Sequence, residues 1–366
     1  MRNAVTAVFA VILWFSGCAD AQTSTLVARD DGAQMLMIAK DTYVITHADA
    51  TDDWPHGNTG VIVTRDGVVV VDTTYLPSRA AADIALIGKV TKRPVRYVLN
   101  THWHFDHNNG TSAYLKAFPG LKVVSERATA KYIELNAGWW AKMSIAANSP
   151  RRLAHADLEK QYETGKDAEN KELSETAQRE LADNLRKQTS EFAELANLQV
   201  VTPGVTFEKK LALTIGGRKI EMRDLGHANS PNDTVVYLPD EKILFTGDIV
   251  VESPLPFVGA SWPVKWIPVL RQIEQWPARL WVPGHGPVMQ DASYIGSVRL
   301  LLETAMREVE AHLREGKTLA QVQDLVKLEK VRASVPVWRD VKNDAGWREV
   351  MRALVERCWR GVRGQG

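Results

Sequence analysis

Apolar and polar residues alternate along residues 43–74, the first strongly patterned part of the chain. The pair Asp66-Gly67 interrupts the alternation and separates residues 61–63 (Val-Ile-Val) from residues 68–71 (four valines). An Asp-Gly pair between two β-branched runs is typical of a tight hairpin turn. The pattern therefore predicts a β-hairpin here.

Helical and extended patterns then follow one another. Residues 77–92 carry apolar side chains at helical spacing and lead into an apolar run at 95–99, which predicts a helix followed by a strand. Further helices are predicted at 112–118 and 126–135, with a short strand at 122–124 between them. A polar, histidine-rich segment thus begins where the strand 95–99 ends.

The middle of the chain has a different composition. Residues 136–197 are rich in Ala, Glu, Lys, Gln and Leu, and no glycine occurs between Lys166 and Asn197. Opposite charges three and four residues apart stabilise helices. We predict a helical insertion whose charges form a solvated face.

Strand patterns resume after the insertion. Residues 206–213 and 218–223 are predicted strands joined by Gly216-Gly217, and 234–238 and 243–245 form a second pair. The stretch 293–360 is mostly helical, with a break near Pro336. Blocks of strands that alternate with helices favour sheets covered by helices, a layered α/β architecture.

Composition narrows the class of protein. The 366 residues are 45% hydrophobic and 24% charged, and the formal net charge is +1. These values are typical of a globular protein, and a neutral balance supplies no broad field for attracting a polyanion. We therefore expect a small-molecule substrate and no nucleic-acid partner; the oligomeric state stays open.

The N-terminus resembles an export signal. Arg2 precedes an apolar run at residues 4–15, and Ala19-Asp20-Ala21 suits cleavage before Gln22. Cys18 lies in a sequence that resembles a lipoprotein box, so membrane attachment through a lipidated Cys18 is an alternative. The mature chain would keep Cys358 alone, or Cys358 with a lipidated Cys18, so we expect no intrachain disulfide. We expect a periplasmic or secreted protein, and a membrane-anchored lipoprotein is the alternative.

The densest chemistry lies in residues 100–110. The segment places His102, His104, Asp106 and His107 within six positions, directly after a predicted strand. In an extended segment, residues two apart point the same way, so His102 and His104 can share one metal ion. Asp106 and His107 lie one turn further on and can reach a second ion.

Three later segments also place a potential ligand directly after a predicted strand. They are Gly226-His227, Thr246-Gly247-Asp248 and Pro283-Gly284-His285-Gly286. Each is weak alone, because such steps are common in turns. Together they converge on one edge of the predicted sheets.

The order of these motifs resembles that of the metallo-β-lactamase superfamily, over residues 38–289. The resemblance implies a four-layer αβ/βα sandwich with metals at the sheet edges. It divides the chain into a leader (1–21), a first αβ half (22–135), the helical insertion (136–200), a second αβ half (201–291) and a helical C-terminal extension (292–366). Asp72 resembles the family's strand-end Asp, which supports the metal-binding loop.

The resemblance also implies a set of ligands and a reaction. The first of two zinc ions would be held by His102, His104 and His227. The second would be held by Asp106, His107 and His285, with Asp248 bridging the two. Two ions about 3.5–4 Å apart can share a hydroxide that attacks a carbonyl, oriented here by Asp106 as the catalytic residue.

Candidate substrate-contacting residues lie on two loops. Trp54 and His56 belong to a loop that overhangs the metals in the family, although an ordinary surface turn fits the sequence equally well. Phe257 and Trp262 follow Asp248 and form either an aromatic wall of the site or part of the core.

Several functions remain open on the sequence alone. Asp248 stands where lactam-hydrolysing subclasses carry Cys or Ser, and Val251 stands where they carry a substrate-binding Lys. These departures weigh against a true β-lactamase and favour a hydrolase that attacks the carbonyl of a small ester, lactone, thioester or lactam. The layout resembles periplasmic zinc metallohydrolases. An iron-dependent persulfide dioxygenase and a non-catalytic metal-binding protein are further alternatives. His104 favours zinc over the di-iron relatives, which carry Glu there.

Overall fold

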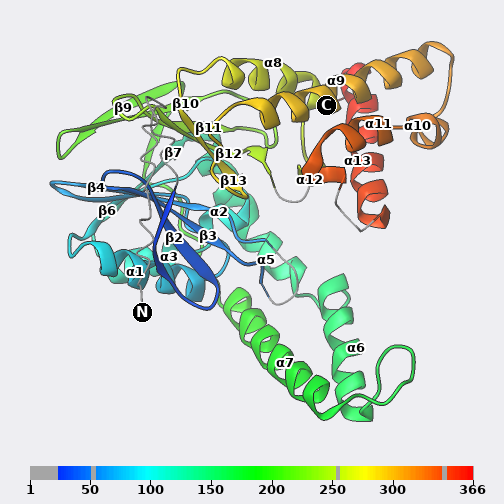
Figure 1. Ribbon diagram of the computed structural model, residues 1–366, viewed down its shortest axis with the longest axis horizontal. Coiled ribbons are helices and arrows are strands. Elements are labelled where there is room, and N and C mark those ends of the chain that lie inside the picture. The colour runs from blue at the N-terminus through cyan, green and yellow to red at the C-terminus, as the bar shows by residue number, and fades with distance from the viewer. Residues whose placement is uncertain (1–23, 51–54, 253–255, 340–343, 366) are drawn as a thin grey trace, which may run out of the picture.

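The computed structural model describes residues 24–50, 55–252, 256–339 and 344–365 (Figure 1). The predicted leader, Cys18 and Trp54 lie outside the described residues. The predictions made for them are therefore not tested by the structure.

Two β-sheets form the centre of the molecule. The first has eight strands in chain order: β1 (Thr25–Arg29), β2 (Ala33–Ala39), β3 (Thr42–His47), β4 (Thr59–Thr64), β5 (Gly67–Val71), β6 (Val95–Leu99), β7 (Lys122–Glu126) and β8 (Val205–Phe207). The pairs from β1 to β5 are antiparallel, and those from β5 to β8 are parallel. The predicted hairpin around Asp66-Gly67 is confirmed as β4 and β5.

The second sheet has five strands. In spatial order they are β13 (Leu280–His285), β12 (Ile243–Val251), β11 (Thr234–Leu238), β10 (Arg218–Asp224) and β9 (Lys210–Ile215). Only β12 and β13 are parallel in this sheet, and the other pairs are antiparallel.

Alternating side chains build two hydrophobic layers from each strand. In β5, Val69 and Val71 pack between the sheets against residues such as Phe245. Val68 and Val70 point to the opposite face and pack with residues of the outer helices. This period of two explains why the strand is apolar throughout, because both of its faces are covered.

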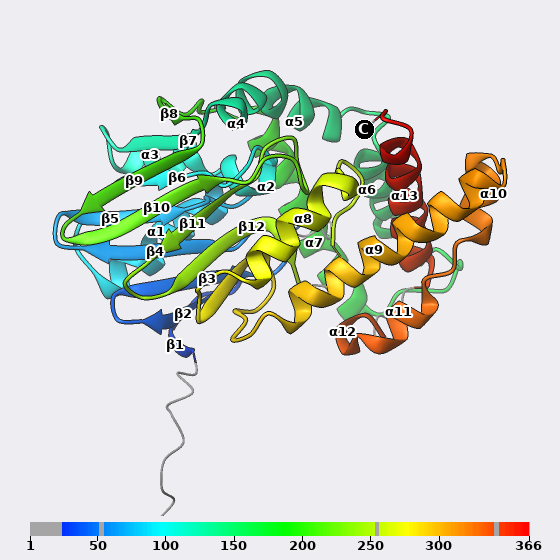
Figure 2. The same ribbon diagram turned by 90° about the horizontal axis from the view of Figure 1, so that it is seen from above.

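Helices cover the outer face of each sheet. The first sheet is covered by α1 (Pro77–Val90) and α3 (Thr111–Ala117), and the second by α8 (Pro263–Glu274) and α9 (Ser293–Arg314). Figure 2 shows α8 and α9 crossing the second sheet. The predicted four-layer αβ/βα sandwich is confirmed.

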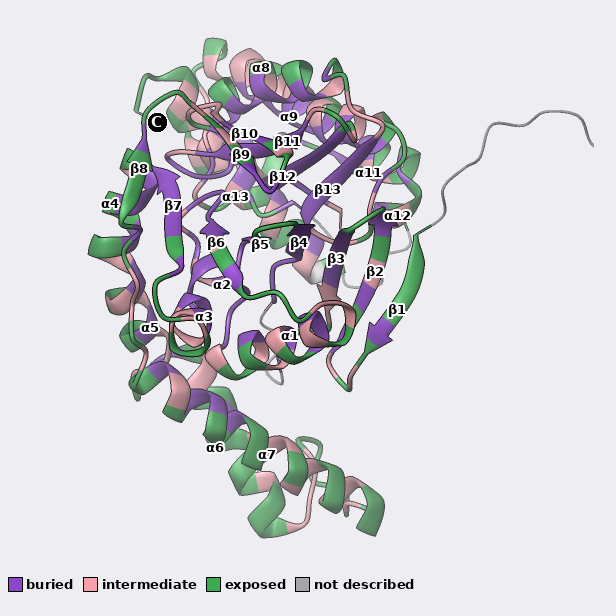
Figure 3. Cartoon of the chain, turned by 90° about the vertical axis from the view of Figure 1, so that its left-hand side faces the viewer, coloured by how far each residue is buried: buried purple, intermediate pink, exposed green. Residues whose placement is uncertain are grey.

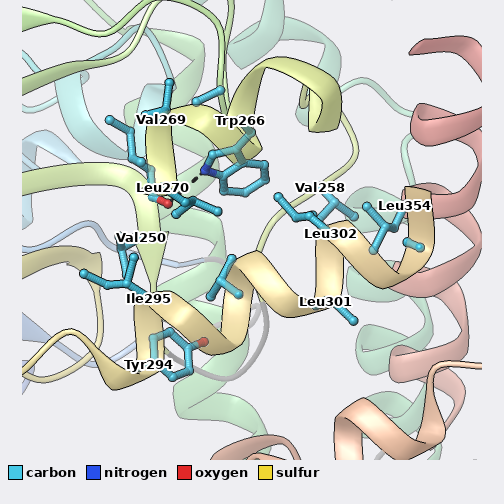
Figure 4. Packing of buried hydrophobic residues seen from close by; sticks show 14 of the residues in the cluster. Val250, Val258, Trp266, Val269, Leu270, Tyr294, Ile295, Leu301, Leu302 and Leu354 are labelled. Atoms are coloured by element: carbon cyan, nitrogen blue, oxygen red, sulfur yellow. Dashed lines mark hydrogen bonds between the residues drawn. The ribbon is translucent and has the colours of Figure 1, made fainter. Parts of the chain in front are cut away.

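The C-terminal helices extend the outer layer of the second sheet. They are α10 (Leu319–Leu325), α11 (Glu329–Ser334), α12 (Pro336–Arg339) and α13 (Asp344–Val362). Their buried residues, including Trp338 and Leu354, join α8, α9 and β12 in one hydrophobic cluster (Figure 4). At its centre, the indole of Trp266 donates a hydrogen bond to the carbonyl of Ile249 at 3.1 Å. Among the helices that the structure describes, none is long and apolar enough to cross a bilayer.

The insertion is helical, as predicted. Within the predicted bounds, 136–200, lie α5 (Gly138–Ser144), α6 (Pro150–Thr164) and α7 (Glu175–Ala196). They directly follow α4 (Arg127–Tyr132) and the π-helix η1 (Ile133–Ala137). The hairpin of α6 and α7 projects away from both sheets and is largely exposed (Figures 1 and 3). Its base packs on the body through Ala141 and Leu195, which are buried with Tyr75 and Leu76.

One predicted strand is divided in two. Residues 206–213 were expected to form a single strand, but β8 belongs to the first sheet and β9 to the second. The chain crosses between the sheets at Glu208 and Lys209. The local pattern of apolar residues does not reveal this crossing, because the strands on either side of it have similar patterns.

Candidate metal centre

The predicted ligands lie where strands of the two sheets end. His102 and His104 follow β6, and Asp106 and His107 lie on the short helix α2 (Phe105–Asn108). Asp248 belongs to β12 and His285 is the last residue of β13. Because the sheets pack face to face, these strand ends meet at one edge of the sandwich.

Four side chains form a compact group, which we call the second group: Asp106, His107, Asp248 and His285. His107 Nε2 lies 3.1 Å from His285 Nε2 and 3.1 Å from Asp248 Oδ1. Asp106 Oδ2 lies 3.0 Å from His285 Nε2 and 3.5 Å from His107 Nε2.

These spacings fit a metal ion. Ligands about 2.1 Å from a tetrahedral zinc ion are about 3.4 Å from one another. Within the described residues, Asp248 Oδ1 is buried without a hydrogen-bond partner. Four buried donor atoms that converge on one point therefore have the geometry and chemistry of a cation site.

A smaller group, the first group, contains His102, His104 and again Asp248. Asp248 Oδ2 lies 3.6 Å from His102 Nε2 and 3.8 Å from His104 Nδ1. Of the described side chains, none gives His102 Nε2 a hydrogen bond, although that atom is buried. One oxygen of Asp248 thus faces each group, which is the arrangement of a bridging carboxylate.

Asp72 orients two of the histidines from behind, through hydrogen bonds to Thr101 and His107. Its carboxylate accepts hydrogen bonds from the backbone and hydroxyl of Thr101, at 2.9 and 2.7 Å, and lies 3.0 Å from His107 Nδ1. Thr101 Oγ1 in turn lies 3.0 Å from His102 Nδ1. Both imidazoles are therefore held with Nε2 toward the centre, as expected of residues that support metal-binding histidines.

Burial and charge act against each other in the centre. Burial raises the pKa of Asp106, but His107 and His285 outweigh it and lower this pKa to about 2. Burial also opposes ionisation of Asp248, and the same histidines hold its pKa well below the usual range. Both carboxylates are therefore charged at neutral pH. The carboxylates conversely raise the pKa of His107 and His285 despite their burial, so protons compete with a metal ion for these imidazoles.

Two glycines allow the close packing around the centre. A Cβ atom on Gly284 would collide with Asp248 Oδ1, and one on Gly57 would collide with the ring of His107. The glycine of the Pro283-Gly284-His285 step therefore has a steric reason: a larger residue at 284 would push the shared carboxylate out of place.

The structure does not bring His227 into either group, and the prediction that it is a ligand is corrected here. His227 is exposed, and its ring packs edge-on against Trp262 with centroids 5.1 Å apart. The Gly-His step suggested a ligand after β10. However, the chain makes a longer turn before β11, and His227 lies on its outer side.

The other predicted contact residues occupy different environments. His56 is buried, and its Nδ1 lies 2.7 Å from Thr74 Oγ1, so it supports the loop rather than lining a surface. Phe257 is 52% exposed, and its ring packs edge-on against His104. Trp262 packs against the His227 ring and the Arg357 guanidinium.

One supporting residue was not predicted. The amide of Asn58 donates hydrogen bonds to the carbonyls of Pro283 and Gly286, at 3.0 and 2.9 Å. It braces the loop that carries His285 against the first sheet. Asn58 lies 225 positions before Pro283, so nothing in the local sequence signals this contact.

Comparison with known proteins identifies the family. The model of the metallo-beta-lactamase superfamily matches residues 52–307. The chain belongs to the metallo-beta-lactamase superfamily, whose members are mostly hydrolases. The His and Asp cluster on this fold indicates a binuclear metal site.

Individual relatives are distant. The linear primary-alkylsulfatase of Pseudomonas sp. (strain ATCC 19151) is 22% identical over 278 residues, which are 73% of this chain and 49% of the relative. The sec-alkylsulfatase Pisa1 from Pseudomonas sp. has a TM-score of 0.60 at 17% identity, over 89% of this chain and 50% of that one. DIM-1 metallo-beta-lactamase exposed to ceftazidime has a TM-score of 0.51 at 16% identity, over 76% and 100%. The chain spans about half the length of the alkylsulfatases that it matches.

Proposed function

We propose that the protein is a dinuclear zinc hydrolase of small substrates. The observation that carries this proposal is the position of Asp248, whose two oxygens face two separate groups of buried ligands. A mononuclear centre needs no such shared carboxylate. Two-metal hydrolases place their ions about 3.5–4 Å apart, a separation that one carboxylate can span.

The donor atoms favour zinc. Both groups consist of imidazole nitrogens and carboxylate oxygens, and the only cysteine among the described residues, Cys358, is buried far along the chain in the C-terminal cluster. Nitrogen-rich sites without thiolate suit zinc, and iron or manganese are the competing ions.

The chain's own residues would do three things in the reaction. Asp106 is ionised and reaches His285, so its carboxylate can also orient the attacking water. Asp72 keeps His107 in one tautomer, and the buried setting of the ligands limits competition from bulk solvent. When bound, zinc would lower the pKa of its water to near neutral pH, and the ion would also polarise the scissile group.

Aromatic residues beside His104 support a substrate with an apolar group. Phe257 contacts the His104 ring, and Trp103 lies 5.0 Å from it, centroid to centroid. Trp103 also packs near Tyr132, at 6.1 Å. We therefore propose a small ester, lactone or thioester with an apolar substituent as the substrate.

A β-lactam is a less favoured substrate. Val251, at the position where the sequence lacks a substrate-binding lysine, is 5% exposed and apolar. Its side chain offers no charge for the carboxylate that β-lactam antibiotics carry.

Alkyl sulfate esters are a second candidate class. One relative is named as a linear primary-alkylsulfatase. In addition, the continuous helix of α4, η1 and α5 exposes an apolar stripe that starts beside Trp103, formed by Tyr132, Leu135, Trp139 and Met143. Trp139 and Met143 lie four residues apart on α5 and share its exposed face, so an apolar surface is available there for a linear alkyl chain.

A substrate panel tests the proposal. The chain from Gln22 onward, loaded with zinc, would be assayed with an aliphatic lactone, a thioester, a long-chain alkyl sulfate and a chromogenic cephalosporin. We expect turnover of one of the first three, and a loss of at least about 100-fold in Asp106→Ala. Asp157→Ala, on the exposed face of α6, is the matched control and should keep full activity. Turnover of none, or turnover that survives Asp106→Ala, would contradict the proposal.

We further propose that the protein is exported. Support comes from the leader-like sequence before Gln22. Mass spectrometry of the N-terminus after expression in a bacterial host distinguishes cleavage before Gln22 from lipidation of Cys18. An intact N-terminus in the cytoplasm would contradict export.

A further inference from the structure

The two groups of ligands are unequal. The second group contributes four side chains, whereas the first group contributes His102, His104 and the shared Asp248. Zinc sites with protein ligands alone are usually four-coordinate, and catalytic sites use three protein ligands plus water. Since His227 faces solvent, a third, unshared ligand of the first group must come from another residue.

Asn229, two residues after His227, has the properties of that ligand. Its side chain is fully buried. The amide nitrogen donates a hydrogen bond to the carbonyl of Phe257 at 2.5 Å, which fixes the orientation of the amide. Within the part of the chain that the structure describes, Oδ1 has no hydrogen-bond partner. A buried amide oxygen without a partner is costly, so it points to a missing ligand.

The turn that carries Asn229 is held next to the first group. The carboxylate of Asp233 accepts hydrogen bonds from the backbone of Ala228 and Ser230, at 3.2 and 2.7 Å, and so clamps the turn on both sides of Asn229. Directly after Asp233, the backbone of Thr234 donates to the carbonyl of Thr101 at 2.9 Å, immediately before His102.

A second link runs through Phe257. The same residue that accepts the Asn229 hydrogen bond packs its ring edge-on against His104, with centroids 5.7 Å apart. Asn229 is therefore tied to both histidines of the first group, through Thr101 on one side and Phe257 on the other.

We propose that Asn229 Oδ1, and not His227, completes the first metal group. This inference rests on the proposed two-metal function and names a ligand of the same centre. A neutral amide oxygen is a weaker ligand for zinc than an imidazole, and carbonyl oxygens suit harder ions such as manganese. The two sites then differ in strength: the second group fills first, and the first group binds its ion more weakly.

Metal titration of three variants tests the assignment. Apo protein and its Asn229→Ala, Asn229→His and His227→Ala variants would be titrated with zinc against a competing chelator, with bound metal measured by mass spectrometry. The wild type should bind two ions in two distinguishable steps. His227→Ala should behave like the wild type. Asn229→Ala should weaken the second step by about 10-fold or more, and Asn229→His should strengthen it.

Cobalt spectroscopy gives a readout that does not depend on affinity or activity. In the cobalt-loaded protein, Asn229→His should change the visible absorption band of the weaker site, because a nitrogen replaces an oxygen, while His227→Ala should leave it unchanged. Asn229→His also keeps the test decisive if Asn229→Ala fails to fold.

The failures are distinguishable. If His227→Ala loses the weaker ion and Asn229→Ala keeps it, or if Asn229→His leaves the cobalt spectrum unchanged, the assignment of Asn229 is wrong although the two-metal proposal stands. If the wild type binds one ion or none, the two-metal proposal fails, and this inference fails with it.

Discussion

The two oxygens of the Asp248 carboxylate face different histidines. Oδ1 lies 3.1 Å from His107 Nε2, and Oδ2 lies 3.6 Å from His102 Nε2. A longer side chain would have to fold back to reach both, and Gly284 leaves room for this one. At the scale of single residues, the centre depends on short side chains held by close backbone contacts.

Replacing Asp72 tests how the histidines are oriented. In Asp72→Asn, the amide can no longer accept both hydrogen bonds from Thr101 and the one from His107, so His107 loses its preferred tautomer. Zinc affinity of the second group should fall by about 10- to 100-fold, as measured by titration against a chelator. Unchanged affinity would mean that Asp72 has no part in orienting the ligand.

His56 should make the fold sensitive to acid. Burial, helped by the nearby His47, lowers the pKa of His56 to about 3, so the folded protein keeps it neutral. The unfolded chain takes up the proton below its ordinary pKa of about 6.5. Stability from this residue is therefore complete above that pH and is lost as pH falls from about 6.5 toward 3.

The measurement is urea unfolding of metal-free protein at about pH 7.5 and about pH 5. The wild type should lose more stability between the two than His56→Gln does, by up to about 2 kcal/mol. Gln keeps a polar partner for Thr74 but does not titrate. Equal losses would contradict a neutral, buried His56.

At the residue scale, the spacing in the sequence predicts which side chains lie together. The run from His102 to His107 is short, so its three histidines and Asp106 are close in space. The structure brings these four side chains together with Asp248 and His285. His227 shows the limit: a Gly-His step after a strand says nothing about the length of the following turn. Asn229 carries no charge and belongs to no motif, so only its burial reveals it.

At the scale of elements, the helix α2, which carries Asp106 and His107, is supported by the insertion. Phe105 on α2 stacks on Trp140 of α5, with ring centroids 3.5 Å apart and planes within 10°. Tyr75 also packs edge-on against Phe105, with ring centroids 5.4 Å apart. The insertion thus contacts α2 through α5, although the hairpin of α6 and α7 projects away (Figure 1).

Substitution of the neighbouring residues Trp140 and Trp139 tests whether the stack on Phe105 supports α2. Trp140→Ala should destabilise the protein by about 2 kcal/mol, because it removes an aromatic stack at the base of the insertion, and should weaken zinc binding through α2. Trp139, which is 62% exposed, is the matched control, and Trp139→Ala should leave stability within about 0.5 kcal/mol. Thermal unfolding and zinc titration measure both; equal destabilisation by the two variants would contradict the role of the stack.

Most elements could be predicted, and the failures were at junctions. The hairpin at Asp66-Gly67, the helix α1 and the strand β6 follow from strong local periodicity. The strand expected at 206–213 is two strands of different sheets, because crossing between sheets depends on long-range pairing rather than on local pattern.

At the scale of the whole molecule, the C-terminal helices do not form a separate core. One hydrophobic cluster joins Trp266 of α8, Leu302 of α9 and Leu354 of α13 (Figure 4). Because each of these helices covers apolar surface of the others, we expect this part of the molecule to unfold with the second sheet as one unit.

Cys358 reports on that coupling. The thiol is fully buried on α13, and burial raises its pKa, so it should not react with a thiol reagent in the native protein. In the chain from Gln22 it is the only cysteine. Its labelling in increasing urea should follow the loss of helical circular dichroism with the same midpoint. Labelling at clearly lower urea would show that the C-terminal helices open independently.

The most direct test of the account is the number of zinc ions bound per chain in the wild type and in Asp248→Ala. Because one carboxylate serves both groups, the wild type should bind about two ions after dialysis against buffered zinc, and Asp248→Ala should retain fewer than about one. Asp157→Ala should bind the same number as the wild type. One ion in the wild type, or two ions retained without Asp248, would contradict a centre built on a shared carboxylate.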